Sequence, residues 1–386
     1  MKIKPVAMLM TVAFLSCASH NARAESGVTQ DTINFGQIAA MSGPAGSLGT
    51  EMRRGVLAAF EEANAKGGVK GHKLALATED DGYEPKNTLP IATKMADEGK
   101  VFALVGSVGT PTTLAIMPLL EEKRLLLVGP VTGAEALRTP YNPHIVNVRA
   151  SYNEETELMV DHLVKDLNAK KIAVFYQNDG FGKAGLTGVN KALEKRSMAP
   201  AIEGSFERNT IAVKDGLSAV MKAEPDAIVI IAPYAPSAVF TKMARKEGYK
   251  GPLLNVSFVG TSALSTALAA GGENVYITQI VPDPTDGANP LVAHYQAALK
   301  KSEASAKFGH GSLEGYLVGR FVVAALEKTS GELTRDNFRQ AITATGSFDI
   351  DGFSLTYGPS DNRGSHAVFL TKTEDAGRVV SVKGLK

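Results

Sequence analysis

Short apolar segments alternate with amphipathic segments along most of the chain, and turns of small or polar residues separate them. The segment 101–105, VFALV, is apolar throughout, as expected for a strand buried on both faces of a parallel sheet. A turn of small and hydroxyl residues follows at 106–110, and a helical pattern with Pro111 in its first turn comes next. This order places backbone N–H groups and hydroxyls at the carboxyl edge of a sheet, where open α/β folds bind ligands. A tight turn without a ligand has the same pattern, so this turn alone leaves both interpretations open.

The same order occurs twice along the chain. In the first series we expect strands at 33–38, 73–78, 101–105, 125–128 and 144–149, with helices at 50–64, 87–97 and from 111. In the second series we expect strands at 171–176, 201–206, 227–231, 252–256 and 275–280, with helices at 154–167, 213–222 and 237–247 and another that follows the turn 177–182 and ends near 195. Strict alternation of strands and helices predicts an α/β fold with doubly wound parallel sheets. The later helical segments, 291–302, 312–328 and 335–343, and the hairpin-like region from 350 are too few for a third domain, so we expect them to complete the first two.

The N-terminal segment has the pattern of an export signal. Lys2 and Lys4 precede a short apolar region at 6–15, and small residues at 22–24 suit a cleavage site, so residues 1–24 are predicted to be a signal peptide. A lipoprotein cleavage site at Cys17 is the less favoured alternative. We therefore expect the mature chain to begin near Glu25 and to act in the periplasm.

Charge and apolar content argue against a nucleic-acid-binding surface and against an internal membrane-spanning helix. Among 386 residues, 41 Lys and Arg balance 40 Asp and Glu, which leaves a net charge of +1 and argues against a nucleic-acid surface. No internal apolar stretch approaches the roughly 20 residues that a membrane helix needs. The hydrophobic fraction of 44% is sufficient for full cores.

The sequence offers little for catalysis. The only cysteine lies inside the predicted signal, so the mature chain has neither a disulfide nor a thiolate metal site. The phosphate-loop, HExxH and GxSxG motifs are absent. We expect the scattered histidines to be surface or capping residues, and the pairs Glu154–Glu155 and Asp80–Asp81 to be solvated faces or helix starts. The prediction is a protein that is not an enzyme and needs no cofactor or metal.

A set of motifs in fixed order carries a family resemblance. They are 41–44 MSGP, 61–74 EEANAKGGVKGHKL, 79–81 EDD, 106–113 GSVGTPTT and 179–182 DGFG. With them the chain resembles the periplasmic substrate-binding proteins of the branched-chain-amino-acid type, which deliver solutes to ABC importers. The resemblance covers essentially the whole mature chain.

The resemblance implies a type I periplasmic binding fold with two lobes that close over a ligand. Three crossovers are expected to join the lobes, near 148–151, 279–282 and 355–358. Lobe 1 would then comprise residues 25–148 plus 281–356, and lobe 2 residues 149–280 plus 357–386. The partners it implies are a small-molecule ligand and an inner-membrane permease, with the protein itself a monomer.

The resemblance also implies the ligand-binding residues. Ser107 and Thr110 match positions that hold a ligand carboxylate through hydroxyl and N–H groups, and the turn Val131-Thr132-Gly133 matches the second binding turn of the same lobe. Lobe 2 is expected to close over the ligand with aromatic residues and with a turn after its fourth strand. These residues are Tyr152, Phe181, Tyr234, Ser257 and Phe258.

One departure from the family pattern leaves the ligand open. Amino-acid binders usually carry an acidic residue just after the strand that ends here at Val256, where it pairs the ligand ammonium; this chain has Ser257 and Phe258. A buried ammonium without a counter-charge costs several kcal/mol. Asp179 could substitute, although a turn aspartate is more often a local cap. The ligand is therefore an amino acid or a related carboxylate, aromatic acid or amide. The alternative function is a sensory binding protein for a small organic acid that signals to a membrane receptor.

Overall fold

The computed structural model describes residues 25–269, 271–374 and 377–385. The predicted signal peptide, with the lipoprotein alternative at Cys17, lies outside these residues. The described strands form three sheets, of five, seven and three strands. Within the same residues no helix is both long and apolar enough to cross a membrane.

The five-stranded sheet forms the centre of lobe 1. Its order is β2-β1-β3-β4-β5 and every pairing is parallel. The strands are β1 (Thr32–Ala39), β2 (Lys73–Asp80), β3 (Ala103–Val105), β4 (Leu126–Val128) and β5 (Ile145–Val146). The β3 and β4 residues are fully buried, as the apolar runs at 101–105 and 125–128 predict.

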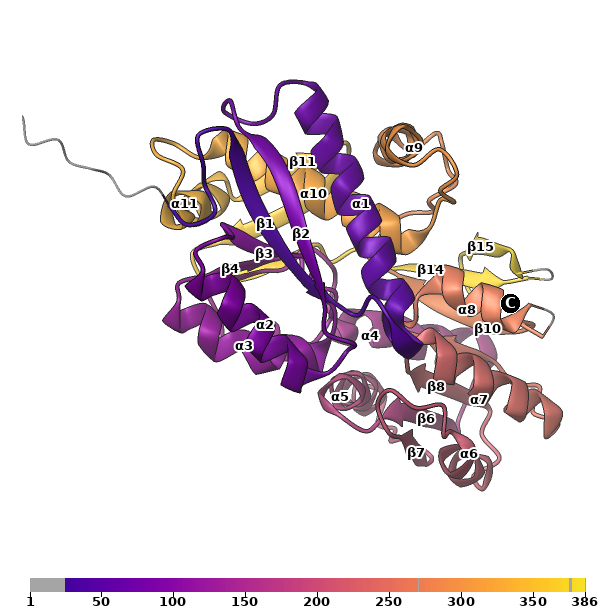
Figure 1. Cartoon of the computed structure of the whole chain (residues 1–386). Coiled ribbons are helices and arrows are strands. Elements are labelled where there is room, and N and C mark those ends of the chain that lie inside the picture. The colour runs from indigo at the N-terminus through magenta and orange to yellow at the C-terminus, as the bar shows by residue number, and fades with distance from the viewer. Residues whose placement is uncertain (1–24, 270, 375–376, 386) are drawn as a thin grey trace, which may run out of the picture.

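Two groups of helices flank this sheet, as Figure 1 shows. α2 (Pro85–Asp97) packs with α3 (Thr110–Glu122), while α1 (Gly46–Ala65), α9 (Pro290–Ser302), α10 (His310–Lys328) and α11 (Arg335–Thr345) form the other group. α1 and α10 approach so closely that a Cβ at Gly55 would lie 2.0 Å from the Ser312 carbonyl oxygen. The late helices thus pack against α1 and one another and contribute to the core around this sheet.

The seven-stranded sheet forms the centre of lobe 2. Its order is β15-β14-β10-β9-β8-β6-β7. The strands are β6 (Ile172–Gln177), β7 (Glu203–Phe206), β8 (Ala227–Ile231), β9 (Leu253–Asn255), β10 (Val275–Gln279), β14 (Phe369–Thr373) and β15 (Val379–Val382). Strands β6 to β10 pair in parallel, but β14 and β15 add to the edge in antiparallel orientation. This sheet is therefore mixed rather than wholly parallel.

Five helices surround the second sheet. They are α4 (Tyr152–Leu167), α5 (Gly180–Glu194), α6 (Lys214–Met221), α7 (Tyr234–Lys246) and α8 (Thr261–Leu268). Four of them match predicted segments. α8 was not predicted, because it has only eight residues and four of them are Ser or Thr, which form helices less readily than Ala or Leu.

The three-stranded antiparallel sheet changes the predicted position of the third crossover. It consists of β11 (Ser347–Ile350), β12 (Phe353–Gly358) and β13 (Asp361–Gly364), and it packs beside β5. The Asn147 backbone N–H donates to the Asn362 carbonyl at 2.9 Å. The expected crossover at 355–358 therefore falls inside β12, and the expected lobe boundary at 356 is misplaced. We place the crossover after Gly364, because β13 still packs beside β5 of lobe 1. The sequence could not show this, because the strand pattern of 353–364 carries no information about which lobe the strands join.

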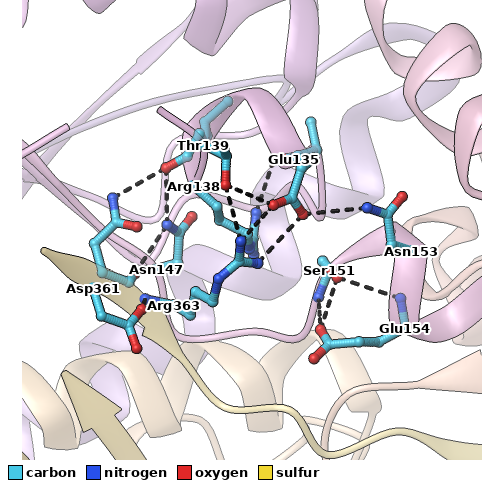
Figure 2. Close-up of polar contacts among 12 residues, drawn as sticks. Glu135, Arg138, Thr139, Asn147, Ser151, Asn153, Glu154, Asp361 and Arg363 are labelled. Carbon is cyan, nitrogen blue, oxygen red and sulfur yellow. Dashed lines mark hydrogen bonds and ion pairs between the residues drawn. The ribbon is translucent and has the colours of Figure 1, made fainter. Parts of the chain in front are cut away.

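The first and third crossovers are tied to one polar cluster (Figure 2). Glu135 accepts hydrogen bonds from Asn153 Nδ2 at 3.3 Å and Thr139 Oγ1 at 2.9 Å, and it pairs with Arg363. Burial alone would raise the pKa of Glu135, but the hydrogen bonds and charge of Arg363 lower it below its usual value. Asn153 belongs to α4 and Arg363 to β13, so this carboxylate is held by segments on both sides of the first crossover.

Candidate functional site

The turn between β3 and α3 has a left-handed backbone that favours glycine at two positions. Gly106 and Gly109 have φ of +65° and +108°. A Cβ at Gly109 would lie 2.3 Å from the Tyr83 ring. The Val131 N–H donates to the Ser107 carbonyl at 2.8 Å, which joins this turn to the turn after β4. Two predicted binding turns thus lie side by side at the carboxyl edge of the sheet.

The hydroxyls of these turns meet at the junction. Thr110 Oγ1 and Thr132 Oγ1 lie 2.6 Å apart, and both side chains are buried. The Ser107 hydroxyl is also buried and has no hydrogen-bond partner within the described residues. The Gly133 carbonyl accepts from the Tyr152 N–H at 2.7 Å, so the first helix of lobe 2 begins directly against this turn. Hydroxyls and the N-terminus of α3 together suit a bound anion.

Four buried aromatic rings form a cluster beside these turns, with Tyr83 against Gly109 and Tyr152 against Gly133. The ring centroids of Tyr152 and Phe181 are 5.5 Å apart, those of Phe181 and Phe258 4.4 Å, and those of Tyr83 and Phe258 6.0 Å. Tyr83 comes from lobe 1 and the other three from lobe 2. Burial raises the pKa of Tyr152 to about 12, so its hydroxyl stays protonated at neutral pH.

Sequence reasoning missed Tyr83. The sequence pattern there indicates only a polar turn that follows the predicted strand 73–78. An aromatic residue at the carboxyl end of a strand, in a fold that binds ligands at that edge, was the available signal. Predicted Tyr234 stands apart from the four rings and donates its hydroxyl to the Gly43 carbonyl at 3.4 Å.

The turn at Ser257 contains buried charge that sequence reasoning did not foresee. Glu155, in α4, accepts from the Ser257 N–H at 2.7 Å and from its hydroxyl at 2.9 Å. Arg149 Nη2 donates to the same hydroxyl at 2.8 Å, and Arg149 Nε lies 3.1 Å from Glu314 Oε1. Of the two expectations for Glu155, a helix start is confirmed, because it lies in the first turn of α4, and a solvated face is wrong, because it is fully buried. No carboxylate follows the strand in sequence, yet the fold brings two to this turn.

Burial and the charge of Arg149 shift the pKa of these two carboxyl groups in opposite directions. Burial raises the pKa of both Glu155 and Glu314 above the usual value, and the nearby Arg149 guanidinium limits the rise. Arg149 itself is 2% exposed and its Nη1 has no hydrogen-bond partner within the described residues. One buried cation therefore serves two buried carboxylates.

A small cavity joins this charged group to the predicted site. Its volume is about 40 Å³, and Val131, Ser257 and Phe258 line it together with Arg149 and Glu314. His310 also lines it, and burial lowers the pKa of this imidazole to about 4, so it is neutral at pH 7. The expectation that this histidine lies at the surface or caps a helix is wrong, since it is 9% exposed and the start of α10 has no side-chain capping hydrogen bond. Within the described residues no cluster of three or more His, Cys, Asp and Glu side chains could hold a metal.

Asp179 is a helix cap. Its Oδ1 accepts from the backbone N–H groups of Phe181 at 2.9 Å and Gly182 at 3.3 Å, at the start of α5. Its Oδ2 accepts from Gln177 Nε2 at 2.6 Å and lies 3.5 Å from Arg208 Nη1. Both oxygens are engaged by protein groups.

Comparisons with known proteins agree along the whole chain. The family model described as periplasmic binding protein matches residues 32–378. A "Leu/Ile/Val-binding protein homolog 3" of Brucella melitensis is 23% identical over 386 residues, covering 99% of each chain. A crystal structure of a possible leucine/isoleucine/valine-binding protein from Rhodopirellula baltica has a TM-score of 0.86 at 36% identity, covering 94% of this chain and 98% of that one. A substrate-binding periplasmic protein from Ralstonia solanacearum has a TM-score of 0.85 at 27% identity, covering 90% of this chain and 99% of that one.

These matches confirm the type I periplasmic binding fold and the resemblance to leucine-binding proteins. The relatives are solute-binding proteins of the periplasm rather than enzymes. Since the family model covers nearly all of the described chain, this protein belongs to the periplasmic binding protein family, as a non-enzymatic, periplasmic solute-binding protein.

Proposed function

We propose that this protein captures a small carboxylate-bearing solute between its two lobes and delivers it to an inner-membrane ABC permease. The observation that carries the proposal is the pairing of the Thr110 and Thr132 hydroxyls, 2.6 Å apart, in the same two turns as the buried Ser107 hydroxyl, which has no hydrogen-bond partner among the described residues. These groups lie at the N-terminus of a 13-residue helix, whose partial positive charge favours an anion. The aromatic rings above them exclude water when the lobes close.

The charges around the site favour an acid over an amino acid. Asp179 is held by two backbone N–H groups, Gln177 and Arg208, so it offers little to a ligand ammonium. Glu155 receives hydrogen bonds from Ser257 and Thr278 and interacts with Arg149. Because these carboxylates already have donors, a ligand ammonium would have to displace them. The proposed ligand class is therefore a small organic or aromatic acid, with branched-chain amino acids, the ligands in the names of several relatives, as the competing class.

Thermal shifts distinguish the two ligand classes. The mature protein from residue 25, refolded to remove carried-over solute, is heated with leucine, isoleucine and valine or with benzoate and short-chain carboxylates. The chain has no tryptophan, so the readout is a dye or calorimetry. A ligand at 100 times its Kd adds about 2.7 kcal/mol of stability, which raises the melting temperature by several degrees. A shift with carboxylates alone supports the proposal, and a shift with amino acids alone contradicts the ligand class.

Thr110→Val is expected to weaken binding of the active carboxylate by about 1–3 kcal/mol, because a buried acceptor loses a donor. The measurement is the Kd by calorimetry. Thr187→Val is the matched control, since Thr187 is an exposed α5 residue whose hydroxyl bonds only its own helix, to the Lys183 carbonyl at 2.8 Å. Equal affinity of Thr110→Val and the parent would show that Thr110 does not hold the ligand.

A further inference from the structure

Two loops, one from each lobe, are joined by hydrogen bonds next to the aromatic cluster. The β2–α2 loop contributes Gly82 and Glu84, and the β7–α6 loop contributes Arg208 and Asn209. Asn209 Nδ2 donates to the Gly82 carbonyl at 3.0 Å and to Glu84 Oε1 at 2.7 Å. Arg208 Nη2 donates to Glu84 Oε2 at 3.0 Å. These four residues are called the interlobe clasp below.

The clasp encloses Tyr83. This residue has φ of +61°, an uncommon conformation for a bulky side chain, and its side chain is fully buried. Buried Asp81 holds the loop by accepting from the Tyr83 N–H and from the Thr88 hydroxyl, each at 2.8 Å. The ring lies against Gly109 and 6.0 Å from the centroid of Phe258. The strained backbone thus directs an aromatic ring of lobe 1 between the anion-binding turn and lobe 2.

A second set of contacts links the clasp to the Tyr83 hydroxyl. Gln177 Nε2 donates to the Tyr83 hydroxyl at 3.4 Å and to Asp179 Oδ2 at 2.6 Å. Arg208 Nη1 lies 3.5 Å from the same Asp179 oxygen. Arg208 therefore touches both the loop that carries Tyr83 and the residues of lobe 2 that receive its hydroxyl.

We propose that Arg208 and Asn209 are positioning residues that hold the lobes together through the clasp and fix Tyr83 as a wall of the ligand site. Naming the ring a wall of the ligand site rests on the proposed function. The clasp itself does not depend on it. Tyr83 then joins Phe181 and Phe258 in bounding the space available to a solute, and clasp opening precedes solute exchange.

The expected size of the effect follows from exposure. The side chains of Arg208 and Glu84 are 24% and 28% exposed, so water and salt screen their attraction. Removing the charge of Arg208 should lower the closed-to-open ratio of the ligand-free protein about fivefold. High salt should shift the wild-type protein in the same direction and have less effect on the variant.

The experiment measures the interlobe distance without any ligand. The mature chain lacks cysteine, so Lys94→Cys in α2 and Lys191→Cys in α5, both exposed, give two unique spin-label sites. Pulsed electron resonance then compares the distance distributions of the parent, Arg208→Gln and Asn209→Gly, the last of which keeps the positive φ of +58° available. We expect both substitutions to increase the longer-distance population, and Arg208→Lys to restore part of the shorter one.

A double-mutant cycle and a matched control define the mechanism. If Glu84 and Arg208 act through each other, Glu84→Gln added to Arg208→Gln should change the distribution little further. Arg196→Gln is the control, because Arg196 is 18% exposed and its contacts with Glu157, Asp161 and the Ala192 carbonyl all lie within its own lobe. Fluorotyrosine labelling adds a readout of Tyr83: the resonance that disappears in Tyr83→Phe should move toward its solvent-exposed position in Arg208→Gln.

The proposal is overturned if Arg208→Gln leaves both the spin-label distances and the Tyr83 resonance unchanged. This includes the case in which the parent protein already shows only the longer distance, so that the substitution cannot increase it. It is equally overturned if Arg196→Gln has the same effect as Arg208→Gln. Neither result bears on solute binding, which the thermal-shift panel tests separately. A silent panel would in turn leave the clasp measurement valid.

Discussion

Arg149→Met is expected to lower the free energy of unfolding by about 3–5 kcal/mol at pH 7, because it leaves buried carboxylates without their cation. Arg149 contacts Glu314 and Ser257, and its charge acts on Glu155. Methionine fills a similar volume, so the lost charge rather than a cavity dominates the result. Chemical denaturation of the mature protein provides the measurement.

The loss of stability caused by Arg149→Met should depend on pH in a defined direction. Burial raises the pKa of Glu155 and Glu314 in the folded protein, so the folded state binds more protons than the unfolded chain just above the ordinary glutamate value of 4.5. For such groups stability falls as pH rises through the raised pKa. Without Arg149 the pKa values of both carboxyl groups rise further. The loss of unfolding free energy in Arg149→Met should therefore be smallest below about pH 4.5 and grow toward pH 7.

Lys165→Met is the control for charge removal. Lys165 is 71% exposed and pairs with Asp161 one helical turn away, and such surface pairs contribute about 0–1 kcal/mol. A loss for Arg149→Met no larger than this control, or a loss that shrinks with rising pH, would contradict the account of the buried charges.

Phe175→Ala is expected to destabilise lobe 2 by about 3–5 kcal/mol, through lost burial and the cavity that remains. Its ring stacks on Phe240 at 4.1 Å and on Phe206 at 5.2 Å, and the side chain is fully buried in β6. These rings belong to a core cluster made only of lobe 2 residues. Calorimetry should therefore show an earlier transition for lobe 2, while the core of lobe 1 is unaffected.

The matched control is Phe369→Ala. Phe369 lies in β14 of the same sheet but is 38% exposed, so its truncation should change stability by only about 0.5 kcal/mol. Equal destabilisation by the two substitutions would show that the stacked rings are not the core of this lobe.

The sequence predicted most elements because their signals are local. Apolar runs such as 227–231 coincide with β8, and helix starts such as Asp179 are visible as capping residues. Elements with weak local signals were lost, as α8 shows. The orientation of β14 and β15 and the lobe to which β12 belongs depend on pairing between residues far apart in sequence, so local pattern gave no information about them.

The residues of the candidate site were likewise predicted only in part. The family resemblance identified Thr110 and Thr132, and the structure brings their hydroxyls within hydrogen-bond distance of each other. Their role in binding a ligand stays a prediction. Tyr83, Glu155 and Glu314 were not identified, because each reaches the site from an element whose sequence looks like an ordinary loop or helix.

What the sequence by itself determined is thus the alternation of strands and helices, the glycine and hydroxyl turns at strand ends, and the family. Only the tertiary structure decided which charges are buried together and which loops meet across the lobes. Arg149 and Glu314 are 165 residues apart, and Glu84 and Asn209 are 125 apart. Such contacts arise from the packing of whole lobes, where burial and charge pairing favour combinations of residues that no local pattern records.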